Sequence, residues 1–332
     1  MREVSNVLVK IPVTEEEATA MRAAAPGASF DFAAPVGDTS QLPKTPKLHI
    51  STTRVAQADV ILGNVAPELI AASSRLQWIQ LGSAGFEAYL APGVLAPSTI
   101  VTNGTGAYGP AVAEHAFAML LSLMKRLPAY WDDQRDHAWS DEGMVSTLSG
   151  ARVLVLGAGD IGHCFGRLCT AVGATCVGVR RHLPRNEPPA DAQAFERVVT
   201  KDALARELPK ADVVASFLPS SDETRGLVGA EFLGSMKTGA YLVNAGRGDL
   251  IDQAALRAAL QEGRLAGAAL DVTTPEPLPA NDPLWDAPNL IITPHVAGFW
   301  HLHSTLERVV ALATENLKRY VRGESLKNVV RG

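Results

Sequence analysis

The stretch Ala151-Arg152-Val153-Leu154-Val155-Leu156-Gly157-Ala158-Gly159-Asp160-Ile161-Gly162 decides the fold of this chain. Its first half is a short apolar run of the kind that forms a buried strand. Three glycines in the spacing G-x-G-x-x-G follow at once, and residues 161–172 continue with the pattern of a helix. We therefore predict a strand, a tight glycine turn and a helix, which together begin a parallel α/β sheet.

The glycine turn predicts a dinucleotide site. The first glycine permits the turn, the second lets backbone N–H groups approach a pyrophosphate, and the third lets helix and strand pack closely. The N-terminus of the following helix would face the phosphates. The cofactor contacts predicted in this turn are Gly157, Gly159, Asp160, Ile161 and Gly162.

Two arginines follow the next predicted strand, 175–179. An acid at this place normally accepts hydrogen bonds from the adenosine ribose, but here the strand leads into Arg180 and Arg181. A guanidinium pairs well with a 2′-phosphate through its fork of donors. The sequence therefore favours NADP(H), and NAD(H) is the alternative in which these arginines are solvated surface charges.

The rest of the chain alternates short apolar runs with helical patterns, which is typical of parallel sheets flanked by helices. Its 332 residues are about twice the length of an average domain, so we expect two domains. A loop rich in Gly, Thr and Asn at 101–110 precedes a helix predicted over 111–126 and closed by Pro128, which marks a domain crossing. A final helix over 303–322 could return to the first domain.

Composition excludes several classes of protein. The net charge of −5 leaves no basic surplus for binding nucleic acid. Cys164, Cys169 and Cys176 are too few for a disulfide framework, and no metal site is predicted around them. Charges near the N-terminus interrupt any signal peptide, and the apolar run 111–124 is too short to span a bilayer. We expect a cytoplasmic protein.

Three polar residues each follow an apolar strand, at the edge where open α/β sheets bind ligands. Arg247 could fix a substrate carboxylate, Glu276 stands between two prolines, and His295 follows Pro294. Taken singly, each has an ordinary alternative: a surface charge, a solvated loop acid and a buried core histidine. Together they form a pattern that resembles a known family of enzymes.

Segments 151–162, 241–248, 268–278 and 292–298 resemble the D-isomer-specific 2-hydroxyacid dehydrogenases. Leu81 to Glu87 and the Ala113-Glu114-His115 motif extend the resemblance over nearly the whole chain. It implies that Arg247 binds the substrate carboxylate, that Glu276 pairs with the histidine, and that His295 is the general acid/base.

The resemblance also implies a fold and further contacts. A Rossmann-type, doubly wound domain, 104–298, would be inserted in a smaller flavodoxin-like substrate domain of 1–103 and 299–332, with the cleft between them. Backbone N–H groups of Ser83, Ala84 and Gly85 would contact the substrate carboxylate, and the helix at 111–126 would make a homodimer. The other predicted cofactor contacts are Leu218, Pro219, Thr224, Asn244, Ala245, Gly246, Asp271 (to the nicotinamide amide) and Gly298.

The implied reaction is reduction of a 2-oxo acid to a D-2-hydroxy acid, and the two arginines resemble the NADP-using glyoxylate and hydroxypyruvate reductase branch. Phe299, Trp300 and Thr273 depart from the family pattern and could favour a larger side chain. Two alternatives stay open. One is a dehydrogenase for a phosphorylated or phosphonate 2-hydroxy acid, with Lys44, Lys47 and Arg54 as available basic residues. The other is a dinucleotide-sensing protein similar to the corepressors on this scaffold.

Overall fold

The computed structural model describes residues 4–39, 50–71, 73–183, 193–298 and 302–332. They form two compact units. Unit 1 comprises Met1–Tyr108 and Gly298–Gly332, and unit 2 comprises Gly109–Ala297. The domain boundaries expected at 103/104 and 298/299 stay a prediction. Lys44, Lys47, Phe299 and Trp300, which the sequence analysis singled out, lie outside the described residues.

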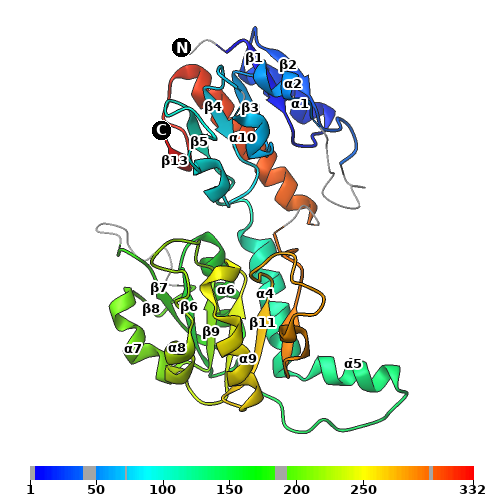
Figure 1. Ribbon diagram of the computed structural model, residues 1–332, viewed down its shortest axis with the longest axis vertical. Coiled ribbons are helices and arrows are strands. Elements are labelled where there is room, and N and C mark those ends of the chain that lie inside the picture. The colour runs from blue at the N-terminus through cyan, green and yellow to red at the C-terminus, as the bar shows by residue number, and fades with distance from the viewer. Residues whose placement is uncertain (1–3, 40–49, 72, 184–192, 299–301) are drawn as a thin grey trace. The chain divides into compact units, whose positions relative to one another are not determined.

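Unit 2 is built on a parallel sheet with the strand order β12-β11-β10-β9-β6-β7-β8 (Figure 1). Its strands are β6 (Arg152–Leu156), β7 (Thr175–Val179), β8 (Arg197–Val199), β9 (Val213–Ser216), β10 (Ala240–Asn244), β11 (Leu265–Leu270) and β12 (Leu290–Ile292). The chain winds outward from β6 to β8, returns to β9 beside β6, and then winds the other way. This doubly wound order confirms the predicted fold class and places its switch point between β6 and β9.

Helices cover both faces of this sheet because its strands are apolar on both sides. The helices of unit 2 are α4 (Gly109–Met124), α5 (Leu127–Arg135), α6 (Asp160–Ala171), α7 (Leu204–Glu207), α8 (Ala230–Ser235) and α9 (Gln253–Gln261), with 3-10 turns at Lys201–Ala203, Leu208–Lys210, Gly248–Leu250 and Pro283–Asp286. Along β6, Val155 faces Gly162 of α6. Leu154 and Leu156 point the other way, into a core shared with Leu256 of α9.

The predicted stop at Pro128 is only half right. α4 ends at Met124, and Arg126 takes the left-handed conformation with φ 54°. Pro128 then stands in the first turn of a second helix, α5, where its missing N–H is no loss. The proline therefore opens a new helix as well as following the end of the old one.

Unit 1 has the strand order β13-β5-β4-β3-β1-β2, in which only the β13–β5 pair is antiparallel. Its strands are β1 (Asn6–Val9), β2 (Ser29–Phe32), β3 (Val60–Leu62), β4 (Trp78–Gln80), β5 (Ile100–Thr102) and β13 (Val329–Arg331); its helices are α1 (Glu15–Ala24), α2 (Thr52–Ala56), α3 (Pro67–Ile70) and α10 (His303–Arg322), with a 3-10 turn at Glu87–Leu90. The order 2-1-3-4-5 is flavodoxin-like, as expected. Val101 and Thr102, predicted as loop, are strand residues.

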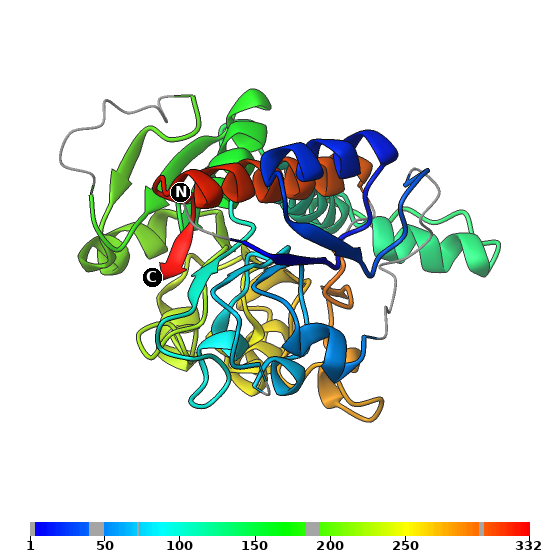
Figure 2. The ribbon, with the colours of Figure 1, turned by 90° about the horizontal axis from the view of Figure 1, so that it is seen from above.

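The C-terminal helix α10 belongs to this sheet. Tyr320 stacks on Trp78 of β4 with ring centroids 4.9 Å apart, and Asn316 donates to the Gln80 side chain at 2.7 Å. Figure 2 shows α10 and α1 running side by side along the sheet. The two ends of the chain thus build one unit.

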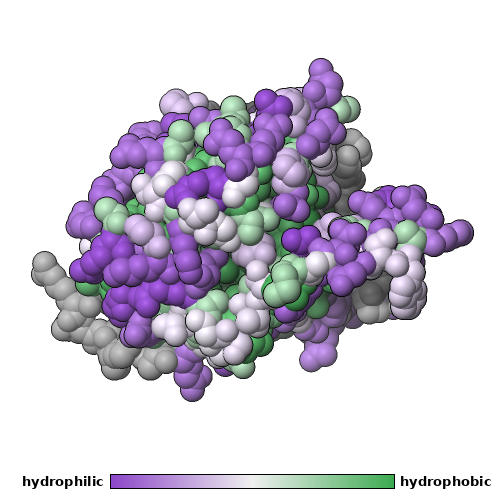
Figure 3. Space-filling view, turned by 90° about the horizontal axis from the view of Figure 1, so that it is seen from below, coloured by the Kyte–Doolittle hydropathy of each residue, from purple (hydrophilic) through white to green (hydrophobic). Residues whose placement is uncertain are grey.

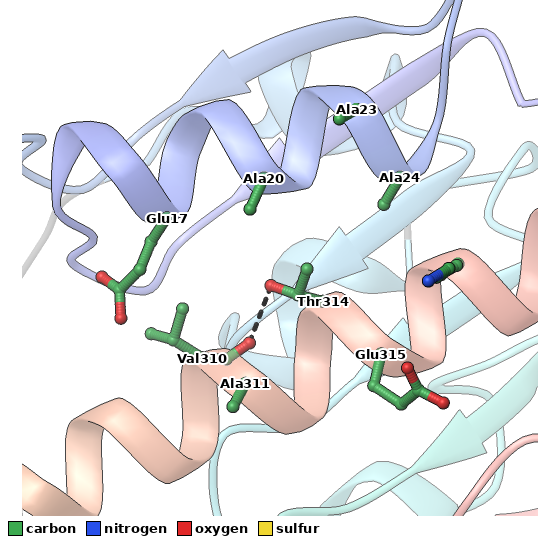
Figure 4. A pocket seen from close by; sticks show the side chains of 9 residues that line it. Glu17, Ala20, Ala23, Ala24, Val310, Ala311, Thr314 and Glu315 are labelled. Atoms are coloured by element: carbon green, nitrogen blue, oxygen red, sulfur yellow. Dashed lines mark hydrogen bonds between the residues drawn. The ribbon is translucent and has the colours of Figure 1, made fainter.

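An open groove of about 480 Å³ lies between α1 and α10. Figure 4 shows its alanine walls and the carboxylates of Glu17 and Glu315 toward its two ends. The residues that line it include none of the predicted site residues. Within the described part of the chain, no helix has the length and apolar character needed to cross a membrane.

Candidate active site

Three neighbouring strands of unit 2 carry the predicted catalytic residues. Arg247 follows β10, Glu276 follows β11 and His295 follows β12. These strands pair in parallel, so their carboxyl ends lie at one edge of the sheet. The structure therefore gathers onto one edge three loops that lie far apart in the sequence.

His295 and Glu276 form a hydrogen-bonded pair. His295 Nδ1 lies 2.8 Å from Glu276 Oε2, and both side chains are partly exposed. The second carboxylate oxygen, Oε1, accepts from the backbone N–H of Thr273 at 3.1 Å. The carboxylate is thus fixed on one side and orients the imidazole on the other, the arrangement of a proton-transfer pair.

The loop that carries His295 is held by Asp271. His295 itself has φ 53°, a left-handed conformation that is uncommon for a residue with a side chain. Its N–H donates to the backbone carbonyl of Asp271 at 2.8 Å, and the next two N–H groups, of Val296 and Ala297, donate to the Asp271 carboxylate at 3.0 and 3.1 Å. Three consecutive hydrogen bonds maintain the unusual backbone.

Arg247 sits in an equally constrained turn. The side chain of Asn244 donates to the Arg247 carbonyl at 2.9 Å and accepts from the N–H of Gly246 at 3.1 Å. A Cβ on Gly248 would overlap the backbone carbonyl of Thr273, so this turn packs directly on the loop after β11. The predicted Asn244, Ala245 and Gly246 therefore shape the turn that presents Arg247.

The glycine turn after β6 has the form that a pyrophosphate requires. Gly157 has φ 90°, and a Cβ on Gly162 would overlap the Gly157 carbonyl. A Cβ on Gly159 would meet nothing within 4 Å, which leaves open space before the N-terminus of α6, where Asp160 and Ile161 begin the helix. These residues fit a dinucleotide, whose phosphates bind at such a helix end.

The loop after β9 packs against the glycine turn after β6 and against the turn after β10. A Cβ on Gly157 would lie 3.1 Å from the Phe217 carbonyl carbon, and one on Gly246 would lie 2.6 Å from the Leu218 oxygen. Thr224 Oγ1 donates to the Pro219 carbonyl at 2.7 Å, which folds this loop back on itself. The predicted residues Leu218, Pro219 and Thr224 thus lie in a loop between two glycine contacts.

The two arginines after β7 have different partners. Arg180 Nε donates to the carbonyl of Ala158 in the glycine turn. Arg181 Nη2 lies 2.7 Å from Glu223 Oε1, and both side chains are exposed. The hydrogen bond from Arg181 and its charge lower the pKa of the Glu223 carboxyl. Sequence reasoning missed Glu223, because nothing in the chain marks it as a neighbour of Arg181.

The predicted substrate contacts Ser83, Ala84 and Gly85 lie in unit 1, after β4. The side chain of Asn64 accepts from the N–H of Ser83 at 3.2 Å, and Asn103 Nδ2 donates to the Ala84 carbonyl at 2.7 Å. Asn64, which the sequence analysis did not select, thus shapes this loop. Gly298 also belongs to unit 1. The roles of these four predicted residues stay predictions.

A glycine turn at the switch point, with a carboxylate–histidine pair at the edge of the same sheet, is the arrangement of a nicotinamide-dependent dehydrogenase. The family model of the D-isomer specific 2-hydroxyacid dehydrogenase NAD-binding domain matches residues 117–297. The chain belongs to the D-isomer specific 2-hydroxyacid dehydrogenase family, as the resemblance implied, and is an oxidoreductase that acts on CH–OH donors.

Named relatives and a solved structure agree with this membership. The D-3-phosphoglycerate dehydrogenase of Mycobacterium tuberculosis is 32% identical over 249 residues, which are 74% of this chain and 46% of that protein. The glyoxylate reductase of Korarchaeum cryptofilum is 29% identical over 291 residues, 86% of each chain. A D-isomer specific 2-hydroxyacid dehydrogenase of Xanthobacter autotrophicus, solved with NADPH and MES, is 26% identical over 99% of this chain and 98% of its own, with a TM-score of 0.76.

Proposed function

We propose that this protein reduces a 2-oxo acid of the glyoxylate or hydroxypyruvate type, or one with a larger side chain, to a D-2-hydroxy acid, and that it prefers NADPH. The observation that carries the proposal is the pairing of His295 with Glu276, 2.8 Å apart, on the sheet edge that also carries Arg247. A proton donor and a carboxylate-binding cation are what carbonyl reduction next to a carboxylate requires.

His295 serves as the proton donor. Because Nδ1 faces Glu276, the proton passes from Nε2 to the substrate carbonyl oxygen as negative charge develops there. After the transfer, the neutral ring keeps its hydrogen on Nδ1, bonded to the carboxylate. Glu276 therefore orients the ring and selects the tautomer, and Thr273 holds Glu276 in turn.

Arg247 holds the substrate. Its guanidinium can bind a carboxylate through two parallel hydrogen bonds, which fixes the adjacent carbonyl carbon in place. The constrained turn at Asn244 and Gly248 limits where that guanidinium can lie. When bound, the nicotinamide cofactor supplies the hydride.

Different residues of the chain would bind different parts of the cofactor. The glycine turn and the N-terminus of α6 would hold the pyrophosphate. Asp271 would accept from the nicotinamide amide, since the donors Thr293 Oγ1, Val296 N and Ala297 N leave its carboxylate room for about one more hydrogen bond. Arg180 and Arg181 would bind the 2′-phosphate. The NADPH bound in the Xanthobacter relative supports NADP(H) as the cofactor.

A second candidate is a dehydrogenase for a phosphorylated or phosphonate 2-hydroxy acid, favoured by the similarity to D-3-phosphoglycerate dehydrogenase. Such a substrate needs an extra cation in unit 1. Arg54, the described member of the three basic residues named above, donates to Asp31 at 2.7 Å. Because the Asp31 carboxylate already neutralises Arg54, we favour a 2-oxo acid substrate whose side chain carries no charge.

Loss of the nicotinamide absorbance band tests both candidates. NADPH and, separately, NADH are mixed with glyoxylate, hydroxypyruvate, pyruvate, phenylpyruvate, phosphonopyruvate and 3-phosphohydroxypyruvate. We expect turnover with an uncharged side chain and a preference for NADPH. Turnover only with the phosphorylated acids would favour the second candidate, and tight cofactor binding without any turnover would favour a dinucleotide sensor.

We also propose that the protein is a homodimer that pairs through an arm formed by α5 and residues 136–147. In Figure 1, α5 points away from the sheet of unit 2, and it forms the projection at the right of the mostly hydrophilic face in Figure 3. The arm nevertheless carries large apolar side chains: Trp131 is 52% exposed, Met144 89% and Trp139 fully. Three large apolar side chains exposed on one arm favour a surface that a partner covers. Sedimentation should find a dimer, which Trp131→Glu should dissociate; a monomeric wild type would refute the proposal.

A further inference from the structure

His115 connects the first helix of unit 2 to the catalytic edge. It stands on α4 within the Ala113-Glu114-His115 motif, to which the proposed reaction assigns no role. His115 Nε2 lies 3.0 Å from Thr293 Oγ1 and 3.7 Å from Asp271 Oδ1, although Thr293 is 178 residues further along the chain. A side chain from α4 thus reaches the loops after β11 and β12.

The hydrogen in this contact can be assigned from the partners of Thr293. Its hydroxyl lies 2.6 Å from Asp271 Oδ1 and 3.6 Å from the sulfur of Met119. A hydroxyl has one hydrogen, and the carboxylate oxygen of Asp271 is a much stronger acceptor for it than the sulfur of Met119. Thr293 therefore donates to Asp271 and accepts from His115, so that Nε2 of His115 carries a hydrogen.

Asp271 connects Thr293 to the loop that carries His295. Its side chain is only 2% exposed, so a misplaced carboxylate would lose hydrogen bonds that water could not replace. The same carboxylate accepts from the N–H groups of Val296 and Ala297, directly after His295. Whatever fixes the position of the carboxylate also fixes this stretch of backbone.

We propose that His115 is a positioning residue: through Thr293 it holds the Asp271 carboxylate in the orientation that keeps the His295 loop in its left-handed turn. His115 touches neither substrate nor the transferred proton in this assignment. The inference rests on the proposed role of His295 for its effect on turnover, but its effect on the loop itself is independent of that role.

Amide hydrogen exchange tests the positioning without substrate or cofactor. His115→Leu removes the donor, whereas His115→Gln places an amide N–H close to the position of Nε2. Thr293→Val removes the hydroxyl at nearly constant shape, and serves as the second variant if His115→Leu fails to fold. The control is Glu114→Gln, which changes an exposed neighbour on the same helix.

We expect the amides of Val296 and Ala297 to exchange about tenfold faster or more in His115→Leu and Thr293→Val, with β6 unchanged. His115→Gln and Glu114→Gln should match wild type. Unchanged exchange in His115→Leu, or in Thr293→Val if His115→Leu does not fold, would overturn the proposal. So would an equal rise across β6, because that outcome shows general loosening instead of positioning.

Turnover of a 2-oxo acid gives the second readout. The kcat of His115→Leu should fall about tenfold or more because His295 is misplaced, and His115→Gln should recover most of it. An unchanged kcat beside faster exchange would overturn the catalytic part of the proposal. If wild type turns over no 2-oxo acid, the proposed function fails, and the exchange data alone still decide whether His115 holds the loop.

Discussion

Glu276 Oε2 lies 2.8 Å from His295 Nδ1, although the two residues stand 19 positions apart on loops that follow different strands. A neutral histidine bonded in this way keeps its hydrogen on Nδ1, so Nε2 remains the nitrogen that exchanges a proton. In the proposed function, this contact makes the two loop residues one proton-transfer pair.

Replacing the carboxylate should disable that device without removing the cofactor site. In Glu276→Gln the side-chain amide can donate to Nδ1, which favours the wrong tautomer, and kcat should fall about 10²- to 10⁴-fold. Steady-state rates and NADPH affinity measured by calorimetry separate the two effects. Glu262→Gln, at the exposed C-terminus of α9, is the control. A Glu276→Gln enzyme with wild-type kcat would contradict the pairing.

Arg247 should not be replaceable by lysine. Lys keeps the charge but cannot form the two parallel hydrogen bonds that fix a carboxylate, so Arg247→Lys should lower kcat/KM for the 2-oxo acid about 10²-fold. The affinity for NADPH should change little. Initial rates over a range of substrate concentrations measure this. Near-normal kcat/KM would show that another group binds the substrate carboxylate.

Substitutions of Arg181 and of Glu223 should change the affinity for a 2′-phosphate in opposite directions. Arg181→Ala should weaken binding of adenosine 2′,5′-bisphosphate, whereas Glu223→Gln should strengthen it, because the carboxylate 2.7 Å from Arg181 competes with a 2′-phosphate. We expect changes of about three- to tenfold in Kd, measured by calorimetry at low salt.

Adenosine 5′-monophosphate, which lacks the 2′-phosphate, should bind both variants as it binds wild type. Asp222→Asn is a matched control, since Asp222 is the fully exposed neighbour of Glu223 and pairs with Arg225 instead. Equal changes for both ligands would count against the assignment of Arg181 to the 2′-phosphate.

A side chain at position 159 should weaken NADPH binding without lowering the stability of the fold. A Cβ at this position would meet no protein atom within 4 Å, but it would occupy the space that the glycine turn leaves for a pyrophosphate. Gly159→Ala should therefore keep the thermal stability of wild type and weaken NADPH binding by about tenfold or more. The control is Gly234→Ala, also in open space but on α8. Full cofactor affinity in Gly159→Ala would place the pyrophosphate elsewhere.

Glu207 on α7 should control acid stability. Burial alone would raise the pKa of its carboxyl, but hydrogen bonds from Arg197, Arg206 and Arg152 and the charge of Arg197 lower it to about 2, from an ordinary value of 4.5. A carboxyl with a lowered pKa stabilises the fold fully above its unfolded pKa. That contribution is lost as the pH falls from about 4.5 toward 2.

Glu207→Gln should therefore lower the free energy of unfolding by about 1–3 kcal/mol at neutral pH, and its stability should vary less across the acid window. Denaturant titrations at several pH values measure both. Glu196→Gln is the matched control, because Glu196 contacts Arg197 and Arg152 but is half exposed, and its effect should be small. Equal effects of the two variants would contradict the role given to burial.

Much of the fold could be predicted because local pattern and tertiary structure agree in its central elements. β7 and α10 begin and end at their predicted residues, since each has a clear apolar period and a clear boundary. β5 was missed because its three residues merge with the glycine-rich loop that follows. α5 was missed because Pro128 ends a helix and begins one equally well.

The candidate site was harder to predict from the sequence. The position of Arg247, Glu276 and His295 after three strands indicated a shared edge, and the strand order places them there. Thr293, Asn64 and Glu223 have no distinctive surroundings in the chain, so their contacts with Asp271, Ser83 and Arg181 could not be predicted. His115 stood out only through the family motif, and its partner is a loop that the chain reaches 178 residues later.

The most direct test of the central claim compares wild type with His295→Asn in the reduction of glyoxylate and hydroxypyruvate, followed by the loss of NADPH absorbance. The account predicts rapid reduction by wild type and, in His295→Asn, a kcat lower by about 10²-fold or more while NADPH still binds. A His295→Asn enzyme that reduces these acids at the wild-type rate would contradict it, because the proton would then come from another group.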